Sequence, residues 1–96
     1  MPKGYLIARV TVTDPNHYPV YARMAGEAIA KYGAKVLARG GRFEAMEGEC
    51  RPRNVILEFE SFERAREYYN SELYQAAKAE RLKAGVGEIV IVEGAE

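Results

Sequence analysis

Two charged residues on predicted strands, Arg39 and Glu58, are the strongest candidates for chemistry in this chain of 96 residues. Glu58 lies between Leu57 and Phe59 in a predicted half-buried strand, where a charged side chain is unfavourable unless it is paired. An arginine can orient an anionic substrate, and a neighbouring carboxylate can accept a proton from it. The alternative is that the two residues form a structural ion pair that fixes the register of two subunits.

The expected register of the sheet would bring these two charges together. If Gly48–Glu49 is the tip of a hairpin, Arg39 lies opposite Glu58 on the adjacent strand. Arg9, on a neighbouring strand, would point to the same face, so that Glu58 lies between two guanidinium groups. Such pairs contribute roughly 0.2–1 kcal/mol when exposed, whereas an enclosed charge that loses its partner costs about 3–5 kcal/mol. The Gly40–Gly41 pair next to Arg39 would let a ligand or a partner backbone come close, unless it only forms a β-bulge.

A second group of candidates carries hydroxyl groups or a positive charge on predicted helices. The tyrosines could line a pocket with phenolic donors, although tyrosines at helical spacing are more often core residues with one polar end. The serine is most simply a helix N-cap, and the arginine could pair with a carboxylate of the first helix or reach a cavity. This group consists of Tyr18, Tyr21, Tyr69, Ser71, Tyr74 and Arg81.

The chain offers little that could hold a metal or a cofactor. His17 is the only histidine and is expected to be solvated, and Cys50 is the only cysteine and is expected to be a surface thiol. One histidine, one cysteine and no acidic cluster cannot build a closed zinc site, and only His17 could be an axial haem ligand. The Gly40–Gly41 pair falls far short of a nucleotide-binding glycine motif. We therefore expect neither a metal nor a cofactor.

Composition excludes several classes of protein. Fourteen basic and fourteen acidic residues cancel and no basic run occurs, so nucleic acid is not an expected partner. No stretch of about 18 apolar residues could span a membrane, and the first residues lack the apolar segment of a signal peptide. A single cysteine cannot form an internal disulfide, which favours the reducing cytoplasm. The length predicts one domain over residues 1–96.

Residue patterns predict four strands and three helices. A break at Gly40–Gly41 follows the second strand, which could continue through 42–46 before a polar turn, and Gly85 and Gly87 would form the exit from the last helix. The predicted strands are 5–13, 34–39, 53–60 and 88–93.

The start of the first helix is ambiguous. Asp14 is a good N-cap and Pro15 suits the first helical position, but Pro19 would then lie inside the helix. The helix therefore either begins near Asn16 or has a distorted first turn, and it ends near Tyr32, before Gly33. The second helix begins after Ser61, and Ser71 restarts it as a third helix that ends near Lys83.

The order of these elements is βαββαβ, with the second helix interrupted. Connection rules turn it into a four-stranded antiparallel sheet of order 4-1-3-2 with the helices on one face, an α+β fold of the ferredoxin-like type. The other face would carry apolar residues together with Arg9, Arg39 and Glu58. Such a face suits a homodimer in which two sheets enclose a partly polar cavity.

The chain resembles the domain of unknown function 1330 family of the dimeric α+β-barrel superfamily. The resemblance spans essentially the whole chain and is most specific in Arg39-Gly40-Gly41, Leu57-Glu58-Phe59 and the segment from Ala65 to Arg81. It implies a homodimer with facing sheets but no particular activity. Tyr68 stands where the family pattern has Trp, and Pro19 in the first helix is a second departure.

Two functions remain open from the sequence. The first is a cofactor-independent enzyme, an isomerase or an oxygenase acting on a small acidic or aromatic metabolite, by analogy with other members of the superfamily. The second is a non-catalytic, ligand-binding or stress-associated dimer.

Overall fold

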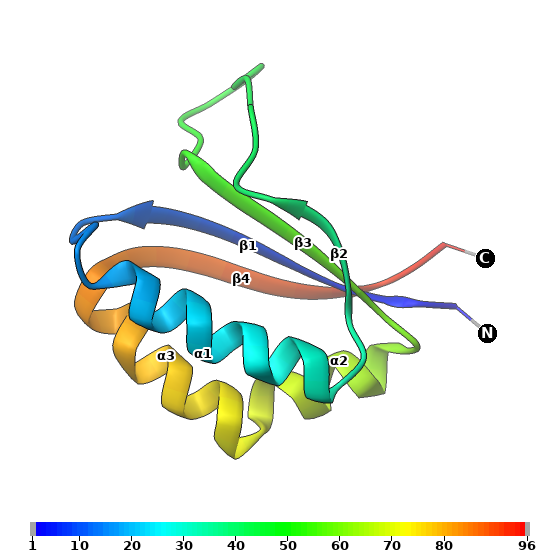
Figure 1. Ribbon diagram of the computed structural model, residues 1–96. Coiled ribbons are helices and arrows are strands. Elements are labelled where there is room, and N and C mark those ends of the chain that lie inside the picture. The colour runs from blue at the N-terminus through cyan, green and yellow to red at the C-terminus, as the bar shows by residue number, and fades with distance from the viewer. Residues whose placement is uncertain (1, 96) are drawn as a thin grey trace.

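One antiparallel sheet and three helices make up residues 2–95, the part of the chain that this computed structural model describes (Figure 1). The elements are β1 (Gly4–Val12), α1 (Tyr18–Lys31), β2 (Lys35–Arg39), β3 (Arg53–Phe59), α2 (Phe62–Asn70), α3 (Glu72–Ala84) and β4 (Gly85–Glu93).

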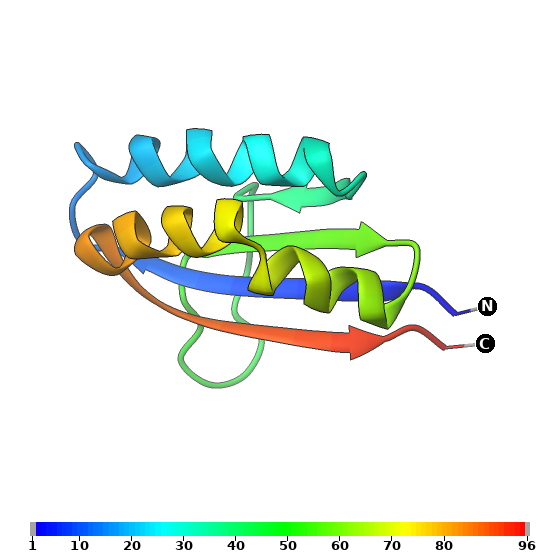
Figure 2. The ribbon, with the colours of Figure 1, turned by 90° about the horizontal axis from the view of Figure 1, so that it is seen from below.

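The strands lie in the order β2-β3-β1-β4, which is the predicted 4-1-3-2 order read from the other edge. Every neighbouring pair is antiparallel. All three helices lie on one face of the sheet, and the segment between β2 and β3 extends away from the opposite, helix-free face (Figure 1). Seen from the helix side, α1 lies beside the β2 edge, whereas α2 and α3 follow one another over the middle of the sheet (Figure 2). The predicted ferredoxin-like fold is therefore confirmed.

The core forms where alternate strand residues meet the helices. Leu6 on β1 pairs with Leu57 on β3, and both are 2% exposed. Tyr68 and Tyr74 supply the largest buried side chains from the helices, with ring centroids 4.9 Å apart. Tilted aromatic pairs of this kind add about 0.5–1.5 kcal/mol beyond the area they bury. Tyr68 is thus a core residue.

The start of α1 resolves the difficulty with Pro19. Asp14 caps a preceding turn, because its Oδ1 accepts hydrogen bonds from the backbone N–H groups of Asn16 and His17. The helix itself begins at Tyr18, so Pro19 lies in its first turn. Backbone N–H groups in the first turn have no acceptor within the helix, so the N–H group that proline lacks is not missed there. The predicted starts at Asp14 and near Asn16 were both too early.

Two other boundaries differ from prediction. Residues 42–46 form no strand, and all of 40–52 is loop. The last strand begins at Gly85. Both Gly85 and Gly87 lie close to the β1 backbone: a Cβ atom would come 2.9 Å from the Thr11 oxygen and 3.1 Å from the Arg9 oxygen, respectively, so a larger residue would require the neighbouring atoms to move. These glycines permit close strand pairing and do not form a turn. No helix within residues 2–95 is long and apolar enough to cross a membrane.

Candidate functional site

Arg39 and Glu58 lie on opposite faces of the sheet, so the predicted pair between them is wrong. Lys35 is the residue opposite Glu58, and Arg39 is opposite Val55. The Glu58 side chain shares the helix-free face with Tyr5, whereas Arg39 lines a cavity on the helix side. The two residues cannot act on the same bound molecule.

A bulge in β2 is the physical reason for the error. The pairing of β2 with β3 shifts between residues 36 and 38, which leaves Leu37 as an extra residue. Because side chains alternate along a strand, one extra residue moves every later side chain to the other face. Arg39 therefore points toward α1 and away from the face where it was expected.

On the helix-free face, Glu58 and Arg9 each have a different polar partner. The Tyr5 hydroxyl group donates a hydrogen bond to Glu58 Oε1 over 3.3 Å. Arg9 Nε donates to Asn54 Oδ1 over 3.2 Å, so the predicted contact of Arg9 with Glu58 is also wrong. Partial burial and the Glu58 carboxylate raise the pKa of Tyr5, which keeps its hydroxyl group a donor.

A cavity of about 190 Å³ lies between α1 and the sheet. The exposed residues Ala22, Gly26 and Arg39 mark its mouth. Small residues on this side of α1 leave space between the helix and the strands, which is why a cavity forms there. The buried residues mark its floor: Leu6, Ala8, Val10, Leu57, Tyr68 and Tyr74.

Tyrosine hydroxyl groups supply polar groups to this largely apolar cavity. The Tyr21 and Tyr74 hydroxyl oxygens lie 3.0 Å apart and share a hydrogen bond. Burial, together with the neighbouring Tyr74, raises the pKa of Tyr21 and of Tyr68. Burial also raises the pKa of Tyr18, although the nearby Arg53 opposes the shift. These groups are therefore neutral hydrogen-bond donors.

Arg53 also lines the cavity, and the sequence reasoning missed it. Its guanidinium carbon lies 5.2 Å from the centroid of the Tyr18 ring, within the range of a cation–π contact. Arg53 could have been found from the strand pattern, because it continues the helix-facing series of Val55 and Leu57 two residues upstream.

Arg81 is buried next to the same tyrosines. Only 4% of its surface is exposed, and its guanidinium carbon lies 5.8 Å from the Tyr21 ring centroid. No carboxylate within residues 2–95 forms an ion pair with it, so the suggested pairing with the first helix is wrong. Burial lowers the pKa of Arg81, but Tyr74 and Tyr21 outweigh this effect and raise it above its usual value, so the group stays charged.

The other predicted residues have structural contacts. Ser71 caps α3: its Oγ accepts a hydrogen bond from the Tyr74 N–H over 3.1 Å and donates to the Tyr68 carbonyl over 2.7 Å. Tyr69 packs against the Tyr74 ring, with 5.2 Å between centroids. Neither Ser71 nor Tyr69 lines the cavity.

The two glycines after Arg39 differ in their surroundings. Gly40 has a φ of +60°, and a Cβ atom there would lie 2.5 Å from Arg53 Nη1. Gly40 therefore lets the chain turn directly beside Arg53. Gly41 faces open space, since a Cβ atom there would have no neighbour within 4 Å.

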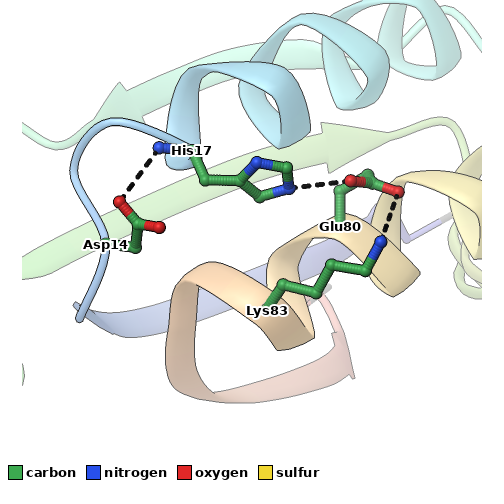
Figure 3. Close-up of polar contacts among 4 residues, drawn as sticks. All are labelled: Asp14, His17, Glu80 and Lys83. Atoms are coloured by element: carbon green, nitrogen blue, oxygen red, sulfur yellow. Dashed lines mark hydrogen bonds and ion pairs between the residues drawn. The ribbon is translucent and has the colours of Figure 1, made fainter.

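His17 contacts a carboxylate, whereas the sequence predicts a solvated side chain. Its Nε2 lies 2.7 Å from Glu80 Oε1 on α3, and Lys83 Nζ lies 3.5 Å from the second carboxylate oxygen (Figure 3). The hydrogen bond from His17 lowers the pKa of Glu80, opposed by partial burial and supported by Lys83. This cluster joins the start of α1 to α3.

No group of three or more His, Cys, Asp or Glu side chains within residues 2–95 could hold a metal ion.

Several solved structures share this fold at low sequence identity. A protein of unknown function from Rhodopseudomonas palustris has a TM-score of 0.76 and 18% identity, over 99% of this chain and 84% of that chain. SnoaB, a cofactor-independent oxygenase from Streptomyces nogalater, has a TM-score of 0.63 and 8% identity, over 100% and 96% of the two chains. A dimeric ferredoxin-like protein of unknown function from Thermobifida fusca has a TM-score of 0.55 and 16% identity, over 99% and 92%.

Sequence comparison places the chain in a family whose function is unknown. None of the curated proteins matches it significantly. The family model described as "Domain of unknown function (DUF1330)" matches residues 3–95, nearly the whole chain. The resemblance found from the Arg-Gly-Gly, Leu-Glu-Phe and helical segments is thereby confirmed, and the chain belongs to the DUF1330 family.

Proposed function

We propose that this protein binds a small aromatic or acidic metabolite in the cavity between α1 and the sheet. The observation that supports this proposal is the combination in one cavity of an apolar floor, neutral tyrosine hydroxyl groups and two arginines, Arg39 and Arg53. Its volume of about 190 Å³ is of the same order as the roughly 150 Å³ of an engineered cavity that binds benzene. A single substituted aromatic ring would fit.

Closing the mouth of the cavity tests this proposal. Ala22→Leu places a larger side chain at an exposed position that lines the cavity, so we expect it to abolish the thermal stabilisation produced by small aromatic compounds such as phenol. Ala30→Leu is the matched control, because Ala30 is exposed on the same helix but does not line the cavity. Equal responses of the two variants would contradict the proposal, as would the absence of any response in the unmodified protein.

A second candidate function is a cofactor-independent enzyme of the isomerase or oxygenase type. Arginines and neutral tyrosines around a ligand stabilise an enolate or phenolate form, which such reactions require. The similar fold of a cofactor-independent oxygenase favours the same candidate by analogy. In this proposal Arg39 binds the substrate anion. No Asp, Glu or His is among the described residues that line the cavity, so the substrate itself would have to be acidic enough to release its proton to water.

Oxygen uptake in the presence of those phenols that bind is the test of this second function. Uptake that depends on Arg39 would support an oxygenase. Binding without turnover of any bound phenol would leave the binding function and count against the oxygenase.

We further propose that two copies assemble through the helix-free face of the sheet. Val86, Val90 and Val92 on β4 are 55%, 54% and 46% exposed on this face. Such a group of exposed apolar side chains is typical of an interface. The description of the Thermobifida fusca protein as dimeric supports a dimer, and the exposed valines indicate the face. In a dimer of this kind Glu58 would contribute to the contact between subunits and not to the cavity.

A further inference from the structure

Three arginines at or beside the cavity have no acidic partner. Arg39 and Arg53 line it, and Arg81 lies behind the Tyr21 ring. No carboxylate within residues 2–95 forms an ion pair with any of the three. The buried Nε atoms of Arg53 and Arg81 also lack a hydrogen-bond partner within this part of the chain. Arg39 is exposed at the mouth, Arg53 is half-buried and Arg81 is buried. A positive charge that is partly removed from water without an acidic partner favours the binding of an anion.

The surroundings of Arg53 contact its side chain but leave its Nε–H group without a hydrogen-bond acceptor. The Tyr18 ring lies on one side, at 5.2 Å, and Gly40 allows Nη1 to approach the backbone closely. These contacts position the guanidinium group but supply no acceptor for Nε. Such contacts restrict the side chain, and a restricted side chain loses less entropy on binding.

The apolar part of the cavity has two walls that favour a flat ligand. One wall is the small-residue side of α1, with Ala22, Ala25 and Gly26. The other is the sheet, where Ala8 on β1 and Val55 on β3 are paired. Tyr18, Tyr21 and Ile29 of α1 line the rest of the helix side. An aromatic ring packs against such small and aromatic side chains better than a bulky aliphatic group does.

We propose that the ligand of the cavity is a small aromatic carboxylate. Its ring would lie between α1 and the sheet, and its carboxylate would be bound by Arg53 with Arg39. The planar guanidinium group matches a carboxylate with two parallel hydrogen bonds, and the anion compensates the unpaired positive charge. Arg81 does not line the cavity and is not part of the proposed carboxylate site. The proposal rests on the binding function proposed above and adds the charge and shape of the ligand.

Calorimetric titration of the full chain with benzoate and benzamide tests the charge. The two probes have nearly the same shape, but only benzoate is charged. Charge-assisted hydrogen bonds are about twice as strong as neutral ones, so benzoate should bind at least roughly 10-fold more tightly. Cyclohexanecarboxylate, which has the charge but not the flat ring, should bind more weakly than benzoate.

Substitution of Arg53 tests the site. Arg53→Met keeps much of the side-chain length and removes the charge, and should weaken benzoate binding by roughly 10- to 100-fold with little effect on benzamide. Arg42→Met is the control, because Arg42 is an exposed arginine of the 40–52 loop that does not line the cavity. If Arg53→Met does not fold, Arg39→Met at the exposed mouth should show the same selective loss.

The outcomes distinguish a failure of this inference from a failure of the proposed binding function. Equal affinities for benzoate and benzamide would overturn the inference and leave a binding cavity in place. Absence of binding by every probe would overturn both. Equal losses in Arg53→Met and Arg42→Met would mean that long-range charge attracts benzoate, and would overturn the assignment of Arg53.

Discussion

Tyrosines whose pKa is raised by burial are the main hydroxyl donors around the cavity. The hydroxyl groups of Tyr21 and Tyr74 share one hydrogen bond, which uses one of their two protons. The other proton is free to be donated to a ligand, whereas the shared one becomes available only if this hydrogen bond breaks. Because both the burial and the partner raise the pKa of Tyr21, its hydroxyl group stays protonated across the physiological range and does not act as a base. At this scale the site is suited to binding and to stabilising an anion.

Ser71 gives a prediction that separates structure from chemistry. Ser71→Ala removes the acceptor of the Tyr74 N–H group and should lower the free energy of unfolding by roughly 0.5–2 kcal/mol, as measured by urea denaturation. Ser71→Asp should lose less, because a carboxylate can still accept this bond. Ligand affinity should be unchanged, since Ser71 does not line the cavity. Unchanged stability in the alanine variant would show that the cap contributes nothing.

The cavity exists because α1 stands in a particular place relative to the sheet and to α3. The helix packs chiefly against α3, and the His17–Glu80 contact joins their ends (Figure 3). Tyr18, the first residue of α1, follows His17 directly and lines the cavity. A change in this contact would therefore alter the position of one cavity wall.

The pKa of Glu80 leads to a prediction about pH. Because the pKa is lowered in the folded state, the ionised carboxylate stabilises the fold above the ordinary glutamate pKa of about 4.3, and this stabilisation is lost as the pH falls. The difference in unfolding free energy between the unmodified protein and Glu80→Gln should be larger at about pH 6 than at about pH 3.

Glu67→Gln is the control for this experiment. Glu67 pairs with Arg64 on the exposed side of α2, with 61% of its side chain exposed, and such pairs contribute little. A difference for Glu80→Gln that does not change with pH would contradict the role of its charge.

The order of the elements and the face that each strand buries could be predicted, because period-two alternation and short connections leave few alternatives. Glu58 was assigned correctly to the helix-free face, which leaves its strand neighbours Leu57 and Phe59 on the helix side, where both are buried. The bulge at Leu37 could not be predicted, since alternation reads the same with or without one extra residue until a partner strand fixes the register. Arg39 was therefore placed on the wrong face, although three of the tyrosines that line the cavity, Tyr18, Tyr21 and Tyr74, were among the predicted site residues.

The distribution of apolar surface over the whole molecule favours assembly. The helices cover one face of the sheet, while the other carries the exposed valines of β4. Phe43 and Met46, in the segment that extends from the helix-free side, are 48% and 80% exposed. A second copy on this face would cover the valines and bring these loop residues near its own surface.

A charged substitution among the exposed valines of β4 tests the dimer. Val90→Lys should yield monomers in light scattering at micromolar concentration, because a buried ammonium group without a partner opposes association. Leu82→Lys is the matched control: Leu82 is 64% exposed on α3, on the helix side, and should leave the assembly unchanged. A fully folded monomer in the unmodified protein would refute the dimer.

Methyl NMR of the full chain with benzoate tests most directly the claim that the ligand binds on the helix side of the sheet. Methyl groups on the two faces of the same strands report separately: Leu6, Val55 and Leu57 face the cavity, whereas Ile7, Ile56 and Val90 face the other side. Benzoate should shift the first set and leave the second unchanged. Shifts confined to Ile7, Ile56 and Val90 would place the ligand between two sheets and contradict the account.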